Sequence, residues 1–250
     1  MAYSHPLIIA NWKMNTNLAD AVIMGNQIKR KLENINHIEV VIAPPSIWLY
    51  PLSEIFSKHP LAHLNLAAQN IHFEEEGAYT GETSVKMVKS FVKYVLIGHS
   101  ERANFGETVK MSNVKIKLAL KYKLRPIVFV GDYRRNTPEK ELVEDLKIML
   151  RGIEKDDYVK LTIVYEPVWA ISSKKSSDPA SGHEVEGVAN AFRKELGPAT
   201  RILYGGSVSK QNCIEFLHLD NIDGLIVGKD SLNVDNFIDI VKNATVNYGN

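Results

Sequence analysis

Short apolar runs alternate with longer amphipathic segments along the whole chain. Eight runs rich in valine, isoleucine and leucine have the length and composition of buried strands, and they cover residues 7–10, 40–43, 64–68, 94–97, 127–130, 161–165, 201–204 and 224–227. Most are followed by a segment with helical periodicity, as at residues 18–32, 109–122, 138–153, 184–196 and 234–241. Near-continuous apolar strands that alternate with helices are typical of a parallel sheet covered by helices.

The number of strand–helix units predicts the architecture. Eight units in 250 residues suit a (β/α)8 barrel, although an open, doubly wound sheet has the same alternation. The chain has neither a dinucleotide-type glycine fingerprint after its first strand nor a Walker sequence, which weakens the open-sheet alternative. No linker rich in Pro, Gly or Ser divides the chain. We therefore predict an α/β fold, a (β/α)8 barrel that forms a single domain over residues 1–250.

Polar residues gather where five of the predicted strands end. In a barrel these carboxyl ends share one rim, and barrel enzymes hold their chemistry there. The candidates along that rim are Asn11, Lys13, His99, Glu101, Glu166, Gly205, Gly206, Ser207, Gly228 and Lys229.

Glu166 is the residue around which the others are organised. It ends a buried strand because the following Pro167 cannot continue a central sheet ladder and disfavours helical backbone at Glu166. A carboxylate in this position acts either as a base or as a structural brace. The serine and lysine run at residues 172–177 has no apolar periodicity, so we predict a mobile loop directly beside the acid.

His99 and Lys13 extend the chemistry that Glu166 suggests. His99 precedes a predicted helix that starts at Ser100, and the positive end of a helix favours a neutral imidazole that can donate a hydrogen bond. Lys13 is a cation that can hold an anion or polarise an oxygen. A capping histidine and a solvated loop lysine are the alternative readings of each residue alone. With Glu166 they suit abstraction of a proton next to a carbonyl group.

Glycines after the seventh and eighth strands point to an anion. Gly205, Gly206, Ser207 and Gly228 leave backbone N–H groups open to a ligand, and barrel phosphate sites lie at these strands. Histidines and cysteines with metal-ligand spacing do not occur, so we expect neither a metal nor another cofactor.

Composition narrows the partners and the compartment. The formal net charge of +1 leaves no large field for nucleic acid or a membrane, so we expect a small-molecule partner. Apolar residues make up 45% of the chain, enough for a full core. Cys213 is the only cysteine, which fits a reducing compartment, and no apolar run suits a signal peptide or a membrane span. We expect a cytoplasmic protein.

Several longer runs resemble the triosephosphate isomerase family along essentially the whole chain. They lie at residues 11–15, 69–70, 77–82, 98–102, 105–107, 165–171, 204–208 and 223–224. The resemblance implies an aldose–ketose isomerase that interconverts dihydroxyacetone phosphate and glyceraldehyde 3-phosphate through an enediolate, without a cofactor. The family's scheme of a glutamate base and a neutral histidine electrophile is taken from the resemblance.

The resemblance also assigns roles to single residues. It implies that Glu166 is the base, His99 the electrophile, and Lys13 with Asn11 the clamp for the substrate oxygens, with Glu101 supporting Lys13. Further residues are implied for the phosphate: Ser172, Gly205, Gly206, Ser207, Gly228 and Lys229. The loop from Gly77 to Glu82 is similar to the family's dimer loop, which implies a homodimer with Thr80 near the partner's active site.

Some positions depart from the family pattern. The lid has Ser-Ser-Lys-Lys at residues 172–175 where Gly-Thr-Gly-Lys is usual. Lys229 replaces the second glycine of a pair and Asp230 a small apolar residue, while Phe129 replaces a cysteine and Ala103 an arginine. These changes fall largely on the phosphate cradle, so they bear on the substrate more than on the reaction.

Two alternatives remain at this point. The segment from Asp178 to Ser181 and the Gly228–Lys229 pair are similar to paralogues that act on four-carbon erythrulose phosphates. In that reading Lys229 either replaces a lost amide contact by direct charge or reshapes the phosphate end. A protein that binds sugar phosphates without turnover is the alternative of another class, but such a protein has no need of Glu166, His99 and Lys13 together.

Overall fold

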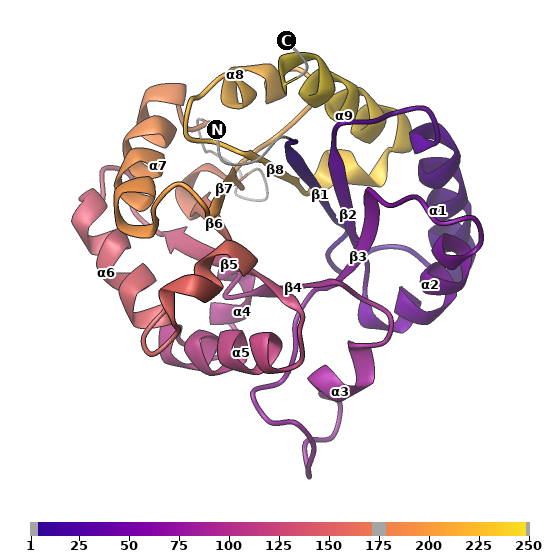
Figure 1. The fold of residues 1–250 in the computed structure, drawn as a ribbon, viewed down its shortest axis with the longest axis horizontal. Helices are drawn as coiled ribbons and strands as arrows, with labels where there is room; N and C mark the ends of the chain where they lie inside the picture. Colours follow the sequence, from indigo (N-terminus) through magenta and orange to yellow (C-terminus); the bar gives the residue numbers. More distant parts are fainter. Residues whose placement is uncertain (1–4, 172–178, 249–250) are drawn as a thin grey trace.

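Eight parallel strands form one closed barrel in the order of the sequence (Figure 1). The computed structural model describes residues 5–171 and 179–248. The strands are β1 (Leu7–Asn11), β2 (Glu39–Ala43), β3 (Leu64–Ala68), β4 (Tyr94–Ile97), β5 (Arg125–Asp132), β6 (Thr162–Pro167), β7 (Arg201–Tyr204) and β8 (Gly224–Val227). Pairing of β1 with β8 closes the ring and leaves no open edge. The predicted (β/α)8 barrel is confirmed.

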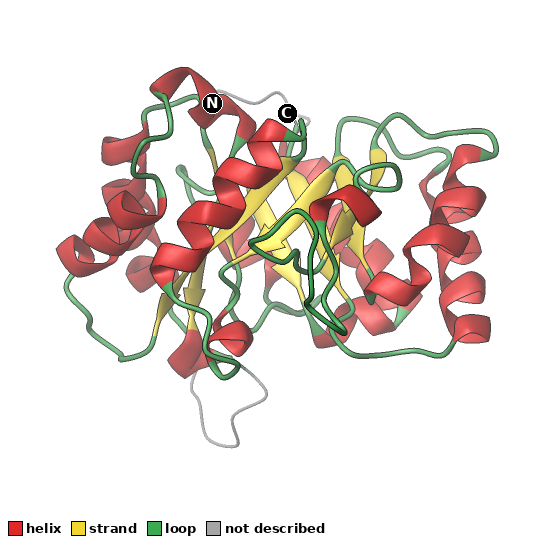
Figure 2. Cartoon of the chain, turned by 90° about the horizontal axis from the view of Figure 1, so that it is seen from below, coloured by secondary structure: helices red, strands yellow, loops and turns green. Residues whose placement is uncertain are grey.

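Helices surround the barrel on its outer side (Figures 1 and 2). The α-helices are α1 (Leu18–Leu32), α2 (Leu49–Ser57), α3 (Val85–Val88), α4 (Ser100–Ala103), α5 (Val109–Lys121), α6 (Glu139–Met149), α7 (Gly182–Leu196), α8 (Cys213–Leu217) and α9 (Val234–Tyr248). Short 3-10 turns are η1 (Ser46–Trp48), η2 (Lys155–Lys160), η3 (Val168–Ala170) and η4 (Lys229–Leu232).

The sequence pattern did not indicate α2, α3 or α8 and misjudged some helix ends. Pro51 obscures α2, although a proline in the first turn costs no helical hydrogen bond because the N–H groups there have no intrahelical acceptor. The helix predicted at residues 138–153 ends at Met149, and α9 runs seven residues beyond the predicted 234–241. These errors lie in exposed or short segments, where periodicity is weakest.

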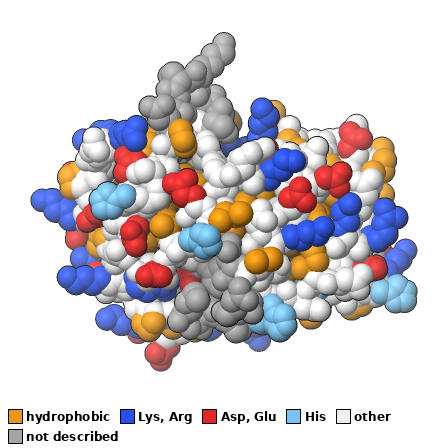
Figure 3. Space-filling view, turned by 90° about the horizontal axis from the view of Figure 1, so that it is seen from above, with side chains coloured by type: hydrophobic (Ala, Val, Ile, Leu, Met, Phe, Trp, Pro, Cys, Tyr) orange, Lys and Arg blue, Asp and Glu red, His pale blue; other side chains and the backbone are white. Residues whose placement is uncertain are grey.

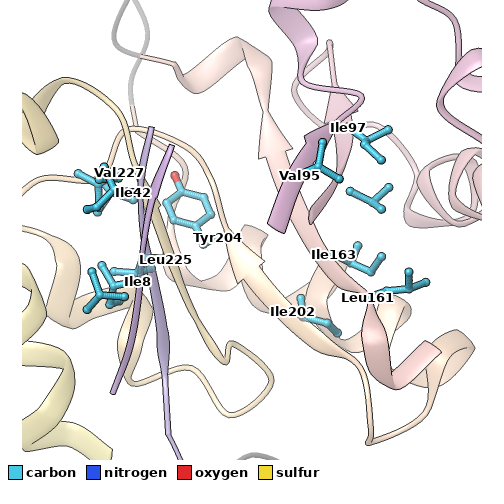
Figure 4. Close-up of a cluster of buried hydrophobic side chains, with 14 of the residues drawn as sticks. Ile8, Ile42, Val95, Ile97, Leu161, Ile163, Ile202, Tyr204, Leu225 and Val227 are labelled. Carbon is cyan, nitrogen blue, oxygen red and sulfur yellow. The ribbon is translucent and has the colours of Figure 1, made fainter. Parts of the chain in front are cut away.

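Each strand is buried on both faces, which explains its nearly continuous apolar sequence. On β1, Leu7 and Ile9 point into the barrel, while Ile8 points outward to the helices. Ile8 lies beside Leu225 of β8, its partner in the register (Figure 4). The two layers form separate clusters, one inside the barrel and one between the barrel and its helices.

A charged cluster closes the amino end of the barrel. Glu39 accepts hydrogen bonds from Arg201 Nη1 at 2.6 Å, Lys93 Nζ at 2.8 Å and the Tyr94 hydroxyl at 2.6 Å. Burial raises the pKa of Glu39, but these hydrogen bonds outweigh it and lower the pKa to about 2. In a barrel, this end contributes to stability and the opposite end to chemistry.

On the face drawn in Figure 3, the described residues form no large region of one charge. Acidic and basic side chains are interspersed over the face drawn in Figure 3. Within residues 5–171 and 179–248, every helix is too short or too polar to cross a membrane.

Candidate active site

A cavity of about 270 Å³ opens at the carboxyl ends of the strands. Its lining contains nine of the eleven site residues expected from the sequence: Asn11, Lys13, His99, Glu166, Gly205, Gly206, Ser207, Gly228 and Lys229. Glu101 lies outside the lining but contacts Lys13. Ser172 and the rest of the expected lid at 172–177 lie outside the described residues. Closure of the barrel thus brings residues from both ends of the chain to one site.

Glu166 is almost completely buried at the end of β6, with 1% of its side chain exposed. Its Oε2 accepts a hydrogen bond from the Ser100 backbone N–H at 2.9 Å, and its Oε1 accepts one from the Ser100 hydroxyl at 3.0 Å. Burial raises the pKa of Glu166 to about 7, because it outweighs the hydrogen bonds from Ser100 and the charge of Lys13. The carboxylate is therefore a far stronger base than an exposed glutamate.

His99 is a neutral hydrogen-bond donor in this site. Its Nδ1 accepts from the Glu101 backbone N–H at 3.2 Å, so the neutral ring carries its proton on Nε2. That nitrogen lies 3.3 Å from Glu166 Oε1. Burial, followed by the charge of Lys13, lowers the pKa of His99 to about 4. The expected neutral imidazole thus owes its state mainly to burial, since α4 is only four residues long.

Lys13 is held in place from three sides. Its backbone has a φ of 52°, a left-handed conformation, and its N–H donates to Asn11 Oδ1 at 3.1 Å. Its carbonyl accepts from the Gln69 side chain at 2.8 Å. The ammonium group contacts Glu101 Oε1 at 2.6 Å. These contacts restrain the rotamers of a long side chain and fix a positive charge at the cavity.

The two glycines after β7 allow close packing against their neighbours, where a side chain would not fit. A Cβ at Gly206 would lie 2.1 Å from the Tyr204 hydroxyl, and one at Gly205 would lie 2.5 Å from Val164. The Gly205 N–H donates to the Tyr165 carbonyl, so the expectation that it is open to a ligand is wrong. Within the described part of the chain, no hydrogen-bond acceptor is found for the Gly206 or Ser207 N–H.

Lys229 differs from Lys13 in lacking a carboxylate partner. It is exposed, lines the cavity, and forms no ion pair with any residue that the structure describes. Ser207, an expected phosphate ligand, donates its Oγ hydrogen to the Ala170 carbonyl at 2.6 Å. This bond links the loop after β7 to η3.

Sequence reasoning missed three supporting residues. Ser100, which holds Glu166, lies within the run 98–102, and Gln69 lies within the run 69–70, but neither was given a role. Asp132 is buried at the end of β5 and accepts from the Tyr165 hydroxyl and Trp169 Nε1, each at 3.1 Å. Asp132 could have been found in the sequence, because it is an acidic residue shortly after the apolar run of a predicted strand.

A closed barrel with a buried base, a neutral imidazole donor and a fixed cation at its catalytic rim defines an aldose–ketose isomerase. The family model described as triosephosphate isomerase matches residues 6–244. The chain belongs to the triosephosphate isomerase family.

Individual relatives agree with this assignment. A protein of Dehalococcoides mccartyi (strain CBDB1) named triosephosphate isomerase is 41% identical over 250 residues, covering 96% of each chain. One of Carboxydothermus hydrogenoformans with the same name is 39% identical over 248 residues, covering 95% of this chain and 98% of the relative. The crystal structure of triosephosphate isomerase from Bartonella henselae superposes with a TM-score of 0.83 at 27% identity, covering 96% of this chain and 98% of that one.

Proposed function

We propose that this chain interconverts dihydroxyacetone phosphate and glyceraldehyde 3-phosphate. In this reaction one hydrogen moves between two adjacent carbons, and one proton moves between their oxygens, so no external reactant is consumed. The observation that carries the proposal is the pairing of Glu166 with His99 Nε2 at 3.3 Å within one cavity. Burial shifts their pKa values in opposite directions, which leaves a base and a neutral donor at neutral pH.

Each residue then has a distinct role. Glu166 removes the proton from the carbon next to the carbonyl group. His99 donates its Nε2–H to the oxygen that becomes negative, and the Lys13 ammonium stabilises that charge. Asn11 restrains Lys13 through the bond to its backbone, and Glu101 holds the ammonium. The enediolate forms when Glu166 takes the proton from the first carbon. The product forms when Glu166 returns this proton to the neighbouring carbon and the hydroxyl proton passes through His99 Nε2 to the oxygen that was the carbonyl.

Glu166 must exchange its partners during this cycle. Both of its oxygens are engaged without a ligand, since Oε2 binds the Ser100 N–H and Oε1 lies near the Ser100 hydroxyl and His99. A substrate carbonyl that accepts the His99 proton frees one of these contacts. The carboxylate can then turn to the carbon. In the absence of substrate, Ser100 thus holds the Glu166 carboxylate through two hydrogen bonds.

The phosphate lies at the other end of the cavity in this proposal. The N–H groups of Gly206 and Ser207 have no acceptor among the described residues. Gly228 lies beside Lys13: a Cβ built at Gly228 would be 3.7 Å from Lys13 Cε. Lys229, which forms no ion pair with any described residue, adds a positive charge near a group that carries two negative charges. Gly205 lines the same cavity. Ser172 is proposed as a further phosphate ligand.

The relatives favour the triose over the alternatives. Every relative compared above is named triosephosphate isomerase, which supports neither an erythrulose phosphate substrate nor a binding protein without turnover. A pure binder also gains nothing from burying Glu166, because removing an ionised carboxylate from water destabilises the fold and raises the pKa of Glu166.

We also propose a homodimer formed through the loop from Gly77 to Glu82. This loop projects from the barrel between β3 and α3 (Figure 1), and its residues are exposed. Met14, next to Lys13, has 96% of its surface exposed, which is unusual for a large apolar side chain near a site. A dimer would cover both regions and bring Thr80 to the partner's cavity. We further propose that residues 1–250 act as one domain in the cytoplasm.

Steady-state assays test the function. The protein is assayed with glyceraldehyde 3-phosphate, dihydroxyacetone phosphate and both erythrulose phosphates. We expect a kcat/KM for the triose more than about a hundredfold above that for either tetrulose, which corresponds to nearly 3 kcal/mol in the barrier. A preference for a tetrulose would overturn the substrate. Binding of glycerol 3-phosphate without exchange of the substrate's carbon-bound hydrogen into D2O would support the binding protein.

A further inference from the structure

Phe129 is a wall of the cavity to which the proposed chemistry assigns no role. It lies on β5 in the cluster inside the barrel, with 1% of its surface exposed, and it lines the cavity. Its ring contacts the His99 imidazole, with ring centroids 4.8 Å apart and planes tilted by 56°. An aromatic ring in this geometry restrains the orientation of its neighbour.

The inward-facing side of β5 places Phe129 at the cavity. Ile127 and Phe129 belong to the interior cluster, and the next position on that side of the strand is Gly131. Gly131 pairs with Glu166 in the register, and the Tyr133 ring lies beside it, with Cε2 3.2 Å from a Cβ built at Gly131. Phe129, two residues earlier, contacts His99 and lines the same cavity as Glu166. It is therefore part of the wall that encloses both groups.

Few polar groups surround the pair formed by Glu166 and His99. Ser100 supplies two hydrogen bonds to Glu166, and His99 Nε2 lies 3.3 Å from Glu166 Oε1. The titratable or charged groups around the pair are Lys13, Glu101 and Lys229 at the main cavity, with Glu107, Tyr133 and Asp145 at a second cavity of about 60 Å³ that His99 also lines. The remaining wall of the main cavity at this end is apolar, and Phe129 is its largest member.

We propose that Phe129 is a positioning residue for the isomerase reaction, whose ring orients the His99 imidazole and keeps water from the cavity wall that it shares with Glu166. This inference rests on the proposed function. Loss of the ring would let water reach the carboxylate and would free the imidazole to rotate. Both effects act on proton transfer, whereas the phosphate end of the cavity remains unchanged.

Phe129→Ala tests the proposal with Ile127→Ala as the matched control. Ile127 lies on the same strand and in the same interior cluster but does not line the cavity. Both variants remove apolar volume from the barrel, so both lower thermal stability. We expect only Phe129→Ala to lower kcat, by about tenfold or more, with KM within about threefold. We also expect it to move the acid limb of the kcat/KM profile down by about one pH unit, because water stabilises the ionised carboxylate.

Two further measurements keep the test decisive if Phe129→Ala folds poorly. Phe129→Leu keeps an apolar side chain in the cavity wall. We therefore expect the acid limb of its kcat/KM profile to lie at the wild-type pH and most of the activity to remain. The 15N resonances of the His99 imidazole, recorded without substrate, should show increased ring averaging in Phe129→Ala and not in Ile127→Ala. Equal loss of kcat in both alanine variants with unchanged pH profiles would overturn the proposal. An inactive wild-type protein would instead refute the proposed function, and the His99 resonances would still report on Phe129.

Discussion

The substitution Glu166→Gln separates two effects of the buried carboxylate: its destabilisation of the fold and its role as the catalytic base. In the folded protein the pKa of Glu166 is about 7, against an ordinary value of 4.5. Between these values the folded state binds more protons than the unfolded state, so the free energy of unfolding falls as the pH rises from 4.5 through 7. The shift of 2.5 pH units corresponds to about 3 kcal/mol at alkaline pH. Glutamine keeps the shape and has no charge to bury.

The prediction therefore has opposite signs for stability and activity. Glu166→Gln should raise the free energy of unfolding by about 3 kcal/mol at pH 8.5 and by only about 1 kcal/mol at pH 5. It should lower kcat by about a thousandfold or more, since the amide cannot accept the proton. Binding of glycerol 3-phosphate should change by no more than a few-fold, because the phosphate end is untouched.

Urea denaturation followed by circular dichroism measures the stability at both pH values. The subunit concentration is kept constant, because association of subunits contributes to apparent stability. Glu184→Gln is the matched control with the opposite sign. Hydrogen bonds from Arg135 lower the pKa of Glu184 to about 2, so this substitution should destabilise the protein above pH 4.5. A gain from Glu166→Gln that is the same at pH 5 and 8.5 would refute the argument from burial.

Further predictions concern the two ends of the barrel and the phosphate. Glu39→Gln should lower the free energy of unfolding by about 3 kcal/mol at pH 7 and by less below pH 4.5. The reason is that the pKa of Glu39 is about 2 in the folded protein, so its ionised form stabilises the fold above the ordinary value of 4.5. Denaturation curves at pH 3 and 7 measure this difference, and kcat should stay unchanged. The kcat/KM profile should have an acid limb near pH 7 from Glu166 and none from His99 between pH 5 and 9, so a second limb in that range would contradict the low pKa of His99. Lys229→Met should raise KM several-fold with little change in kcat and should weaken its dependence on salt, and an unchanged KM would remove Lys229 from the phosphate site.

The hydrophobic periodicity of the sequence predicts most of the fold. The strands β3, β4, β7 and β8 have the predicted bounds, because residues buried on both faces leave a continuous apolar signal. Helix α2 escaped prediction because its proline disguises a first turn that tolerates it. Closure of the ring through β1 and β8 joins residues more than two hundred positions apart, and no local pattern encodes such a pairing.

The candidate site divides in the same way. The residue types at the carboxyl ends of the strands are predictable from local patterns, because strand ends are local features. The facing of His99 Nε2 to Glu166, the hydrogen bonds from Ser100 to the carboxylate, and the bond from the Gly205 N–H to Tyr165 arise only when the barrel closes. Burial decided the protonation states of Glu166 and His99. Burial arises when distant segments pack around a group and exclude water, so it is a property of the folded barrel that no short stretch of sequence possesses.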